Sequence, residues 1–299
     1  MDNYSQNETP QPFDQNQTRR NRIRCQSALP DHAFICDHVA DQVADRLLDI
    51  KRNFPNIALI GPARLPQNII PVIKKNAGAN NFVTIDYCKA DIIGNEEALP
   101  FGRKSLDSIL SILTLHTIND LPGALFQINY ALKPDGLFLG AMLGGETLYE
   151  LRHALMAAEN EITGGVSPRV MPFADKQDMG ALLQRAGFAL PVVDSDVIEV
   201  TYTALKDLLY DIRGMGESNI VAERPRHFAP RALFDRAEEI YKNNFSDHQG
   251  RLIARFEVIY LIGWAPHESQ QKPLRPGSAE NSLAEAIGGR ERKTDIPTG

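Results

Sequence analysis

The stretch that decides the fold is FPNIALIGPARLPQNIIPVI, residues 54–73. An apolar run from Ile57 to Ile60 reaches Gly61, and a segment typical of a helix follows. A cofactor-binding strand, loop and helix begins in this way. Such a loop usually carries two or three glycines, which let the backbone approach a ligand. Here PARLP follows the single glycine, so the stretch predicts a strand and a helix but leaves a nucleotide site open.

Apolar strands and amphipathic helices alternate after this stretch. Further strands are expected at residues 81–86, 105–115 and 137–143, and helices at residues 32–50, 66–75, 119–136, 145–161 and 175–188. Alternation of this kind predicts an α/β fold, with a Rossmann-like, mostly parallel sheet and helices on both faces. The segments DVIEVTY and RFEVIYLIGW predict an antiparallel pair at one edge, with a helical insertion, residues 204–250, between these last two strands.

The composition changes at both ends of the chain. Residues 1–30 are polar and rich in Asn and Gln, which predicts a disordered arm, and its basic run TRRNRIR at 18–24 is expected to be solvated. Residues 266–299 have the same character and predict a disordered tail. The patterned sequence between them, residues 31–265, predicts one folded domain.

Composition excludes several classes of protein. The net charge is −6, whereas nucleic-acid-binding proteins usually carry a basic stripe. The longest apolar runs are well below the roughly 18 residues that suggest a membrane span. Cys25, Cys36 and Cys88 show no paired spacing, so we expect reduced thiols, no metal site and a cytoplasmic location. The N-terminus lacks the apolar core of a secretory signal, and its acidic residues are wrong for a mitochondrial transit peptide.

Three longer segments carry a specific resemblance. They are EEALPFGRKSLDSILSILTLHTINDLPGALFQINYALKPDGLFLGAMLGGETLYELRHAL, GMGESN and YLIGWAPHESQ. Together with the element order, they resemble class I S-adenosylmethionine-dependent methyltransferases, in the branch of respiratory complex I assembly factor 5. Bacterial members of this branch are close to the malonyl-carrier-protein methyltransferases of biotin synthesis. The resemblance covers about residues 13–277. It implies either methyl transfer or, as in the mitochondrial member, hydroxylation of an arginine in a complex I subunit.

The cofactor loop departs from the pattern of this family. The family reads Asp-Leu-Gly-x-Gly-x-Gly, and this chain places Leu59 at the acid, Ala63 at the second glycine and Leu65 at the third. Only Gly61 matches. The resemblance implies S-adenosyl-L-methionine as the cofactor, but a side chain at a position where backbone must touch a ligand blocks it sterically. We therefore predict weak or absent binding of this cofactor.

Two further cofactor positions follow the second strand. Asp86 matches the acid that binds the ribose hydroxyls, although a solvated aspartate at a strand end is an alternative. Asn95 stands where the family has an acid beside the adenine pocket. Only 14 positions separate Asp86 from Pro100, too few for a crossover helix and a strand. We expect that helix to be missing, with DII as a vestigial edge strand and Glu96 and Glu97 as a solvated pair.

Four residues are candidates for the substrate side. His116 follows the fourth strand, where it could act as a general base or be a hydrogen-bonded structural histidine. Glu146 either faces the substrate or stabilises the start of a helix. Glu217 and Asn219, in GMGESN, belong either to the cover of the substrate cleft, as the resemblance implies, or to a loop that ends a helix.

Two hypotheses about function remain. The first is a methyltransferase-fold assembly factor for respiratory complex I that binds a subunit, with or without modifying it. The second is an active S-adenosylmethionine-dependent methyltransferase that acts on a small molecule or a carrier protein. Both are consistent with a cytoplasmic protein, and the first adds a peripheral position at the inner membrane. The residues leave open whether the chain is an enzyme or a pseudoenzyme.

Overall fold

The computed structural model describes residues 11–271. It divides the chain into two compact units, Met1–Pro266 and His267–Gly299. In the second unit only residues 267–271 are described, where the His267 N–H donates a hydrogen bond to the Gln270 side chain at 3.2 Å. Most of the predicted disordered tail, residues 272–299, therefore lies outside the described residues, as do residues 1–10 of the predicted arm.

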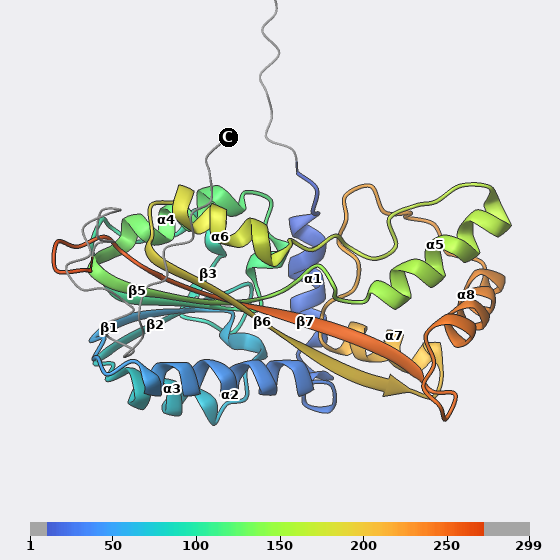
Figure 1. Cartoon of the computed structure of the whole chain (residues 1–299), viewed down its shortest axis with the longest axis horizontal. Helices are drawn as coiled ribbons and strands as arrows, with labels where there is room; N and C mark the ends of the chain where they lie inside the picture. Colours follow the sequence, from blue (N-terminus) through green and yellow to red (C-terminus); the bar gives the residue numbers. More distant parts are fainter. Residues whose placement is uncertain (1–10, 272–299) are drawn as a thin grey trace, which may run out of the picture. The chain divides into compact units, whose positions relative to one another are not determined.

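The first unit is built on a seven-stranded sheet with the order β3-β2-β1-β4-β5-β7-β6 (Figure 1). Neighbouring strands from β3 to β5 pair in parallel, and β7 pairs antiparallel with both β5 and β6. The predicted Rossmann-like sheet with an antiparallel edge pair is confirmed. The strands are β1 (Asn56–Ile60), β2 (Asn81–Asp86), β3 (Ile92–Ile93), β4 (Leu106–Ile112), β5 (Leu132–Leu143), β6 (Ala189–Tyr202) and β7 (Leu252–Trp264).

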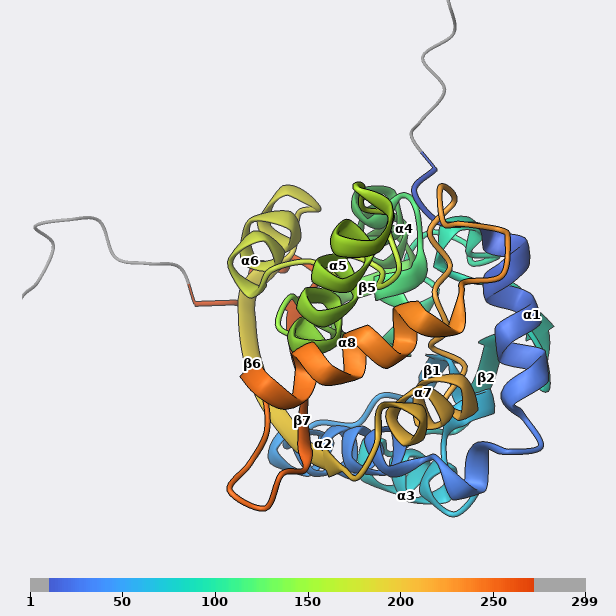
Figure 2. The same cartoon turned by 90° about the vertical axis from the view of Figure 1, so that its right-hand side faces the viewer.

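Helices cover both faces of the sheet. Figure 1 shows α2 and α3 below the sheet and α4 and α6 above it, while Figure 2 faces the end where α5 and α8 lie side by side and α7 lies close by. The predicted insertion between the last two strands consists of α7 and α8. The helices are α1 (Gln15–Cys25), α2 (Phe34–Asp49), α3 (Ile69–Ala77), α4 (Leu121–Ala131), α5 (Tyr149–Thr163), α6 (Lys176–Arg185), α7 (Leu205–Gly214) and α8 (Arg231–Asn244).

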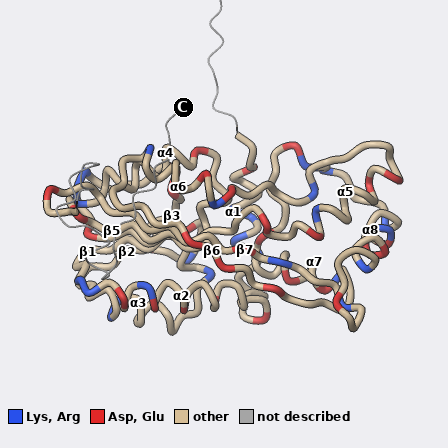
Figure 3. Tube along the Cα trace, in the orientation of Figure 1, with Lys and Arg blue, Asp and Glu red and all other residues tan. Residues whose placement is uncertain are grey.

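Strand β1 shows how the sequence produces this layering. Ile57 and Leu59 pack into the apolar cluster on one face of the sheet, and Ala58 and Ile60 pack into the cluster on the other. Successive side chains of a strand point to opposite faces, so a continuous apolar run is buried on both sides. Acidic and basic side chains are mixed along α2 and α8, away from this core (Figure 3).

The crossover after β2 is as short as the sequence predicts. All residues from 87 to 100 are described, and they form only the two-residue strand β3 and a 3-10 turn at Glu96–Ala98. The expected loss of the crossover helix is confirmed. As a result, the chain passes from β2 to β4 directly over the carboxyl end of β4.

The expectation of a disordered N-terminal arm is wrong for the part of it that is described. Residues 15–25 form α1, which Asp14 caps by accepting the Gln17 N–H at 3.0 Å. The buried residues of this helix are Thr18, Asn21, Arg22 and Cys25. They follow an i, i+3, i+4, i+7 pattern, so they share one face. Most of this buried face is polar, which is why a search for apolar periodicity missed the helix.

Candidate functional site

The candidate site lies where the carboxyl ends of β1, β4 and β5 meet α1 and the loop after α7. Gly61 ends β1 with a φ of +89°, and the 3-10 turn Pro62–Arg64 follows. A Cβ atom on Gly61 would lie 2.3 Å from the carbonyl oxygen of Ile112 at the end of β4. Gly61 is therefore required by the backbone of the neighbouring strand. Its presence is no evidence of a ligand.

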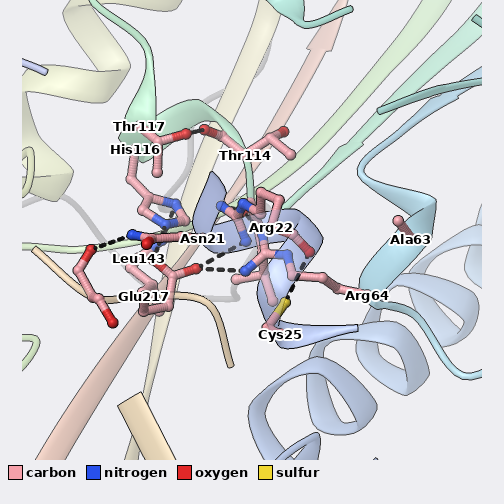
Figure 4. Close-up of polar contacts among 12 residues, drawn as sticks. Asn21, Arg22, Cys25, Ala63, Arg64, Thr114, His116, Thr117, Leu143 and Glu217 are labelled. Atoms are coloured by element: carbon pink, nitrogen blue, oxygen red, sulfur yellow. Dashed lines mark hydrogen bonds and ion pairs between the residues drawn. The ribbon is translucent and has the colours of Figure 1, made fainter. Parts of the chain in front are cut away.

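Four side chains form a buried cluster here, which we call the arginine cluster: Arg22, Arg64, His116 and Glu217 (Figure 4). Arg22 reaches it from α1, donating from Nη1 to Glu217 Oε1 at 3.2 Å and from Nη2 to the Leu113 carbonyl at 3.1 Å. Arg64 donates to the same two oxygens. Each arginine side chain is only 2% exposed, so two guanidinium groups share one carboxylate away from water.

The charges in the cluster stabilise one another. Burial alone would disfavour ionisation of Glu217, but the positive charge of Arg22 and the contact with His116 hold its pKa below the usual value. Burial likewise disfavours the charged form of Arg22, yet Glu217 and Asp86 keep the pKa of Arg22 above its usual value. Removing the partner of a buried charge is strongly destabilising. The carboxylate of Glu217 is therefore the group on which both arginines depend.

His116 has both ring nitrogens engaged. Nε2 lies 3.1 Å from Glu217 Oε2, and Nδ1 lies 3.4 Å from the Leu143 backbone nitrogen, which donates to it. An Nδ1 that accepts leaves the ring proton on Nε2, directed at the carboxylate. The ring is not free to take a proton from a substrate in this arrangement. A catalytic role for His116 stays a prediction, and the geometry favours the structural alternative.

Asp86 is buried, with 3% of its surface exposed. One carboxylate oxygen accepts the Ala63 N–H at 2.9 Å and the other accepts the N–H of Tyr87 at 2.6 Å. Burial raises the pKa of this carboxyl group. The side chain ties the first loop to the end of β2, so Asp86 has a structural role whether or not a ligand binds.

Asn95 also serves the backbone. Its Oδ1 accepts the Glu97 N–H at 3.1 Å, which caps the 3-10 turn, and its Nδ2 donates to the Tyr87 hydroxyl at 2.9 Å. Asn95 lies outside the arginine cluster, so the structure does not bring this predicted cofactor residue together with His116 and Glu217.

The expectation that Glu96 and Glu97 form a solvated pair is wrong. Glu96 is fully buried and accepts hydrogen bonds from the hydroxyl groups of Ser111, at 2.7 Å, and Thr114. Burial raises the pKa of Glu96, although these two hydrogen bonds oppose the rise. Glu97 is partly buried and accepts the Asn119 N–H. The missing crossover helix explains the burial, because the turn that replaces it rests on the end of β4.

The other substrate-side candidates separate into two places. Asn219 lies two residues beyond Glu217, where it donates to the Pro168 carbonyl at 2.6 Å and accepts the Val221 N–H at 3.0 Å. Glu146 is exposed and lies before α5, with its N–H donating to the Glu257 carboxylate at 3.0 Å. It lines a separate hollow with residues such as Tyr149. Glu146 therefore does not join His116 and Glu217.

Sequence reasoning missed both arginines of the cluster. Arg22 lies in the TRRNRIR run that was expected to be solvated, and Arg64 lies in the loop that lacks its glycines. No apolar periodicity marked Arg22, because most of the buried positions of α1 are polar. Arg64 offered no such signal, because a lone arginine in a loop is usually solvated.

A partly open pocket of about 270 Å³, which we call the apolar cavity, adjoins the cluster, and the insertion forms part of its wall. Glu217, Ser218 and Asn219 line one part of it, and none of Gly61, Asp86 and Asn95 does. A broader hollow of about 700 Å³ lies beside the first loop, and the same three cofactor candidates are absent from its lining too. Within residues 11–271, no group of three or more His, Cys, Asp or Glu side chains could hold a metal ion.

The geometry does not fit S-adenosyl-L-methionine at the matched positions. Each carboxylate oxygen of Asp86 already accepts a backbone N–H, and Asp86 lines neither hollow near the site. Arg22 and Arg64 fill the space between the first loop and the Leu113 carbonyl (Figure 4). We therefore assign no chemical step to this cofactor.

The sheet order and the antiparallel pair of β6 and β7 define a class I methyltransferase fold, and the family model described as methyltransferase domain matches residues 65–140. Within that class, the chain belongs to the NDUFAF5 family. It is 39% identical over 285 residues to the arginine-hydroxylase NDUFAF5, mitochondrial, of Danio rerio, a match that covers 91% of this chain and 88% of the relative. The Homo sapiens relative of the same name is 41% identical over 263 residues, covering 84% and 76%.

More distant similarity extends to enzymes that transfer methyl groups. The malonyl-[acyl-carrier protein] O-methyltransferase of Gallionella capsiferriformans is 34% identical over 175 residues, covering 58% of each chain. In the part of this chain that the structure describes, every helix is too short or too polar to cross a bilayer.

Proposed function

We propose that this protein is an assembly factor for respiratory complex I that binds a subunit as its client and does not use S-adenosyl-L-methionine. In this proposal the methyltransferase fold is kept as a binding scaffold, and the chain is a pseudoenzyme with respect to methyl transfer. Membership of the NDUFAF5 family supports the role in assembly. Contact with the client is expected on the cytoplasmic side of the inner membrane.

The arginine cluster is the observation that carries the proposal. Arg22 from α1 and Arg64 from the first loop occupy the end of the sheet where ligands bind in folds of this kind. Their shared contact with Glu217 is buried, so displacing either guanidinium group would expose charges that now compensate each other. A cofactor would have to supply equivalent contacts to take this space.

Calorimetry on the full chain tests the cofactor half of the proposal. Titration with S-adenosyl-L-methionine and with S-adenosyl-L-homocysteine is expected to give no binding in the low-micromolar range. A dissociation constant in that range for the unmodified chain would contradict the proposal.

Deletion of the gene in its native host tests the assembly half. Inhibitor-sensitive NADH oxidation in membranes should fall, and the peripheral arm of complex I should fail to mature. Re-expression of the chain should restore both, and re-expression of Glu217→Gln should not. Normal complex I in the deletion strain, in a host without a second copy, would rule out this function.

One observation supports the alternative of an active methyltransferase. The hollow of about 700 Å³ beside the first loop is large enough for a ligand of cofactor size. Lys89 and Asp91 lie on its wall, where they could contact a nucleoside. The calorimetric titration separates this alternative from the proposal, and Asp91→Asn would weaken any binding that uses the hollow.

A further inference from the structure

The hollow that contains Glu146 lies between the starts of α5 and α6, over β6 and β7, and we call it the Glu257 hollow. It is partly open to solvent, and its lining includes Glu146, Tyr149, Phe173, Asp175, Val197 and Glu257. No member of the arginine cluster lines it, and neither does Gly61, Asp86 or Asn95. The Glu257 hollow is therefore separate from the matched cofactor positions.

The carboxylate of Glu257 is held firmly in the wall of this hollow. The residue is only 7% exposed. Its Oε2 accepts the Glu146 N–H at 3.0 Å, and a Cβ atom on Gly144 would lie 2.6 Å from the same oxygen. The Thr147 hydroxyl donates to the Glu257 carbonyl and accepts the Glu257 N–H, both at 3.1 Å. These contacts fix the backbone of Glu257 and turn Oε2 toward the loop before α5.

No cation in the described part of the chain pairs with Glu257. Its Oε1 accepts no hydrogen bond from residues 11–271, yet it is not among the unpartnered oxygens that the fold seals from solvent. Arg255 also lines the hollow, but its guanidinium group pairs with Glu150 at 2.8 Å and with Glu199 at 3.5 Å. Lys176, in the same lining, is exposed and forms no ion pair within those residues. Because glutamate is rarely this buried without a partner, Oε1 indicates a cation from outside the chain.

The rest of the lining also favours a cation. Glu146 and Asp175 add two carboxylates, so the acidic side chains of the lining outnumber the basic ones even before the partners of Arg255 are considered. Tyr149, with 51% of its surface exposed, and Phe173 add aromatic rings, which attract cations and pack against apolar stems. The ligand expected here is a positive charge on an apolar stem.

The shape of the charge follows from the single oxygen on offer. A guanidinium group prefers both oxygens of a carboxylate, which it contacts as a planar fork, whereas an ammonium group is a compact point charge. Oε2 packs against Gly144 and Glu146, so the free oxygen suits the ammonium group better. A divalent metal ion needs more ligands, and residues 11–271 contain no group of three acidic, His or Cys side chains that could supply them.

We propose that the Glu257 hollow binds a primary ammonium group, which donates to Glu257 Oε1 while its apolar stem packs against Tyr149 and Phe173. The ammonium group belongs either to a lysine side chain of a protein or to a free alkylamine. Glu146, which the sequence places on the substrate side, lies in the wall of this site. The inference does not depend on a role in complex I assembly.

Titrations of the purified full chain followed by ligand-observed NMR test the proposal, at about 0.15 M salt to screen distant charges. Nα-acetyl-lysine N-methylamide should bind about ten-fold more tightly than the norleucine derivative, which has the same stem without the charge. The arginine derivative should bind about three-fold more weakly than the lysine derivative, because it cannot use both oxygens. Butylammonium distinguishes the sources. Tighter binding than the lysine derivative indicates a free amine, and weaker binding indicates a lysine side chain.

Charge variants assign the binding to this hollow. Glu257→Gln should weaken binding of the lysine derivative about ten-fold. Glu223→Gln removes the same charge at an exposed position outside the hollow, so it should change the affinity by less than about two-fold. Lys176→Met removes a competing cation from the lining and should strengthen binding about two-fold. The circular dichroism of each variant must match that of the parent chain.

A second kind of variant supplies the ammonium group from within. Val197 lies directly opposite Glu257 in the pairing of β6 with β7, so the two side chains share one face. Val197→Lys should abolish binding of the lysine derivative and raise the melting temperature, because the new side chain reaches the carboxylate. Val197→Met adds a stem of similar length without the charge, so its melting temperature should stay below that of Val197→Lys. This comparison holds even where Glu257→Gln fails to fold.

Four results would overturn the proposal. The first is equal affinity for the lysine and norleucine derivatives, or no binding of either. The second is tighter binding of the arginine derivative than of the lysine derivative, which would assign the hollow to a guanidinium group. The third is an equal loss of binding for Glu257→Gln and Glu223→Gln, which indicates attraction to the net charge of −6 alone. The fourth is a melting temperature for Val197→Lys at or below that of Val197→Met.

Discussion

Two neighbouring regions at the carboxyl ends of the strands have packed in opposite ways. Around the first loop, charged side chains fill the space, and Arg22 and Arg64 converge on Glu217. At the insertion, apolar side chains from several elements line a partly open pocket of about 270 Å³. Buried ion pairs hold the first loop in place, whereas the pocket at the insertion is partly open to solvent. The comparison teaches that one end of the sheet combines a tightly packed polar cluster with an apolar pocket.

The largest effect is expected when the filled region loses its carboxylate. Glu217→Gln removes the only carboxylate that both buried guanidinium groups contact in the described chain, and it should lower the free energy of unfolding by about 3–5 kcal/mol. Urea unfolding followed by circular dichroism measures this loss. Glu223→Gln, an exposed change six residues further along the chain, should alter stability by less than about 0.5 kcal/mol. A loss below about 1 kcal/mol for Glu217→Gln would mean that the cluster does not hold this region together.

The next effect concerns the glycine that the first loop retains. Gly61→Ala places a Cβ 2.3 Å from the Ile112 carbonyl oxygen on a backbone with φ of +89°. We expect a loss of about 2–3 kcal/mol in the free energy of unfolding, from backbone strain and a shift of β4. Gly164→Ala is a matched control, because Gly164 has φ of +71° and no atom within 4 Å of the added Cβ. Equal losses for the two changes would show that strain alone matters and that the contact with β4 does not.

A smaller effect is expected for Arg22→Met. The change leaves Arg64 and Glu217 as a pair of opposite charges, and Arg64 still donates to the Leu113 carbonyl. The free energy of unfolding should fall by less than about 1.5 kcal/mol. The informative quantity is the loss for Arg22→Met divided by the loss for Glu217→Gln. Urea unfolding of both variants, measured together, gives this ratio. If Arg22→Met lowers the free energy of unfolding as much as Glu217→Gln does, both arginines are required. In that case the second positive charge does not destabilise the cluster.

The smallest effect is a difference in pH dependence between two buried glutamates. The pKa of Glu217 is lowered in the folded chain, so its contribution to stability is present above the ordinary value of 4.5 and is lost as the pH falls below it. The pKa of Glu96 is raised, so the folded chain takes up a proton first and gains stability as the pH falls toward 4.5. Relative to the parent chain, Glu217→Gln should therefore become less destabilising on acidification. Glu96→Gln should become more destabilising. Unfolding curves at pH 7, 5.5 and 4 measure both trends, and parallel trends would contradict the assignment.

The sequence predicted the regions that apolar periodicity controls. The apolar run Ile57–Ile60 and the edge pair of β6 and β7 follow from patterns that bury apolar area, and the short link between Asp86 and Pro100 follows from chain length. The sequence failed where polar groups are buried. The buried face of α1 and the buried carboxyl group of Glu96 depend on partners distant in sequence, which no local pattern reveals. The candidate site consists mainly of such contacts, so it was the harder part to predict.

The short strand β3 has a consequence for self-association. It pairs with only two residues of β2, so most of β2 would otherwise form the exposed edge of the sheet. Unpaired edges can recruit a strand from another molecule, and natural proteins blunt them with charges and short strands. Here the carboxylate of Asp91 accepts the backbone N–H of Thr84 at 2.9 Å and its hydroxyl at 2.7 Å, in the place of a neighbouring strand. The chain can therefore lack the crossover helix without leaving that part of the edge open to amyloid-like stacking.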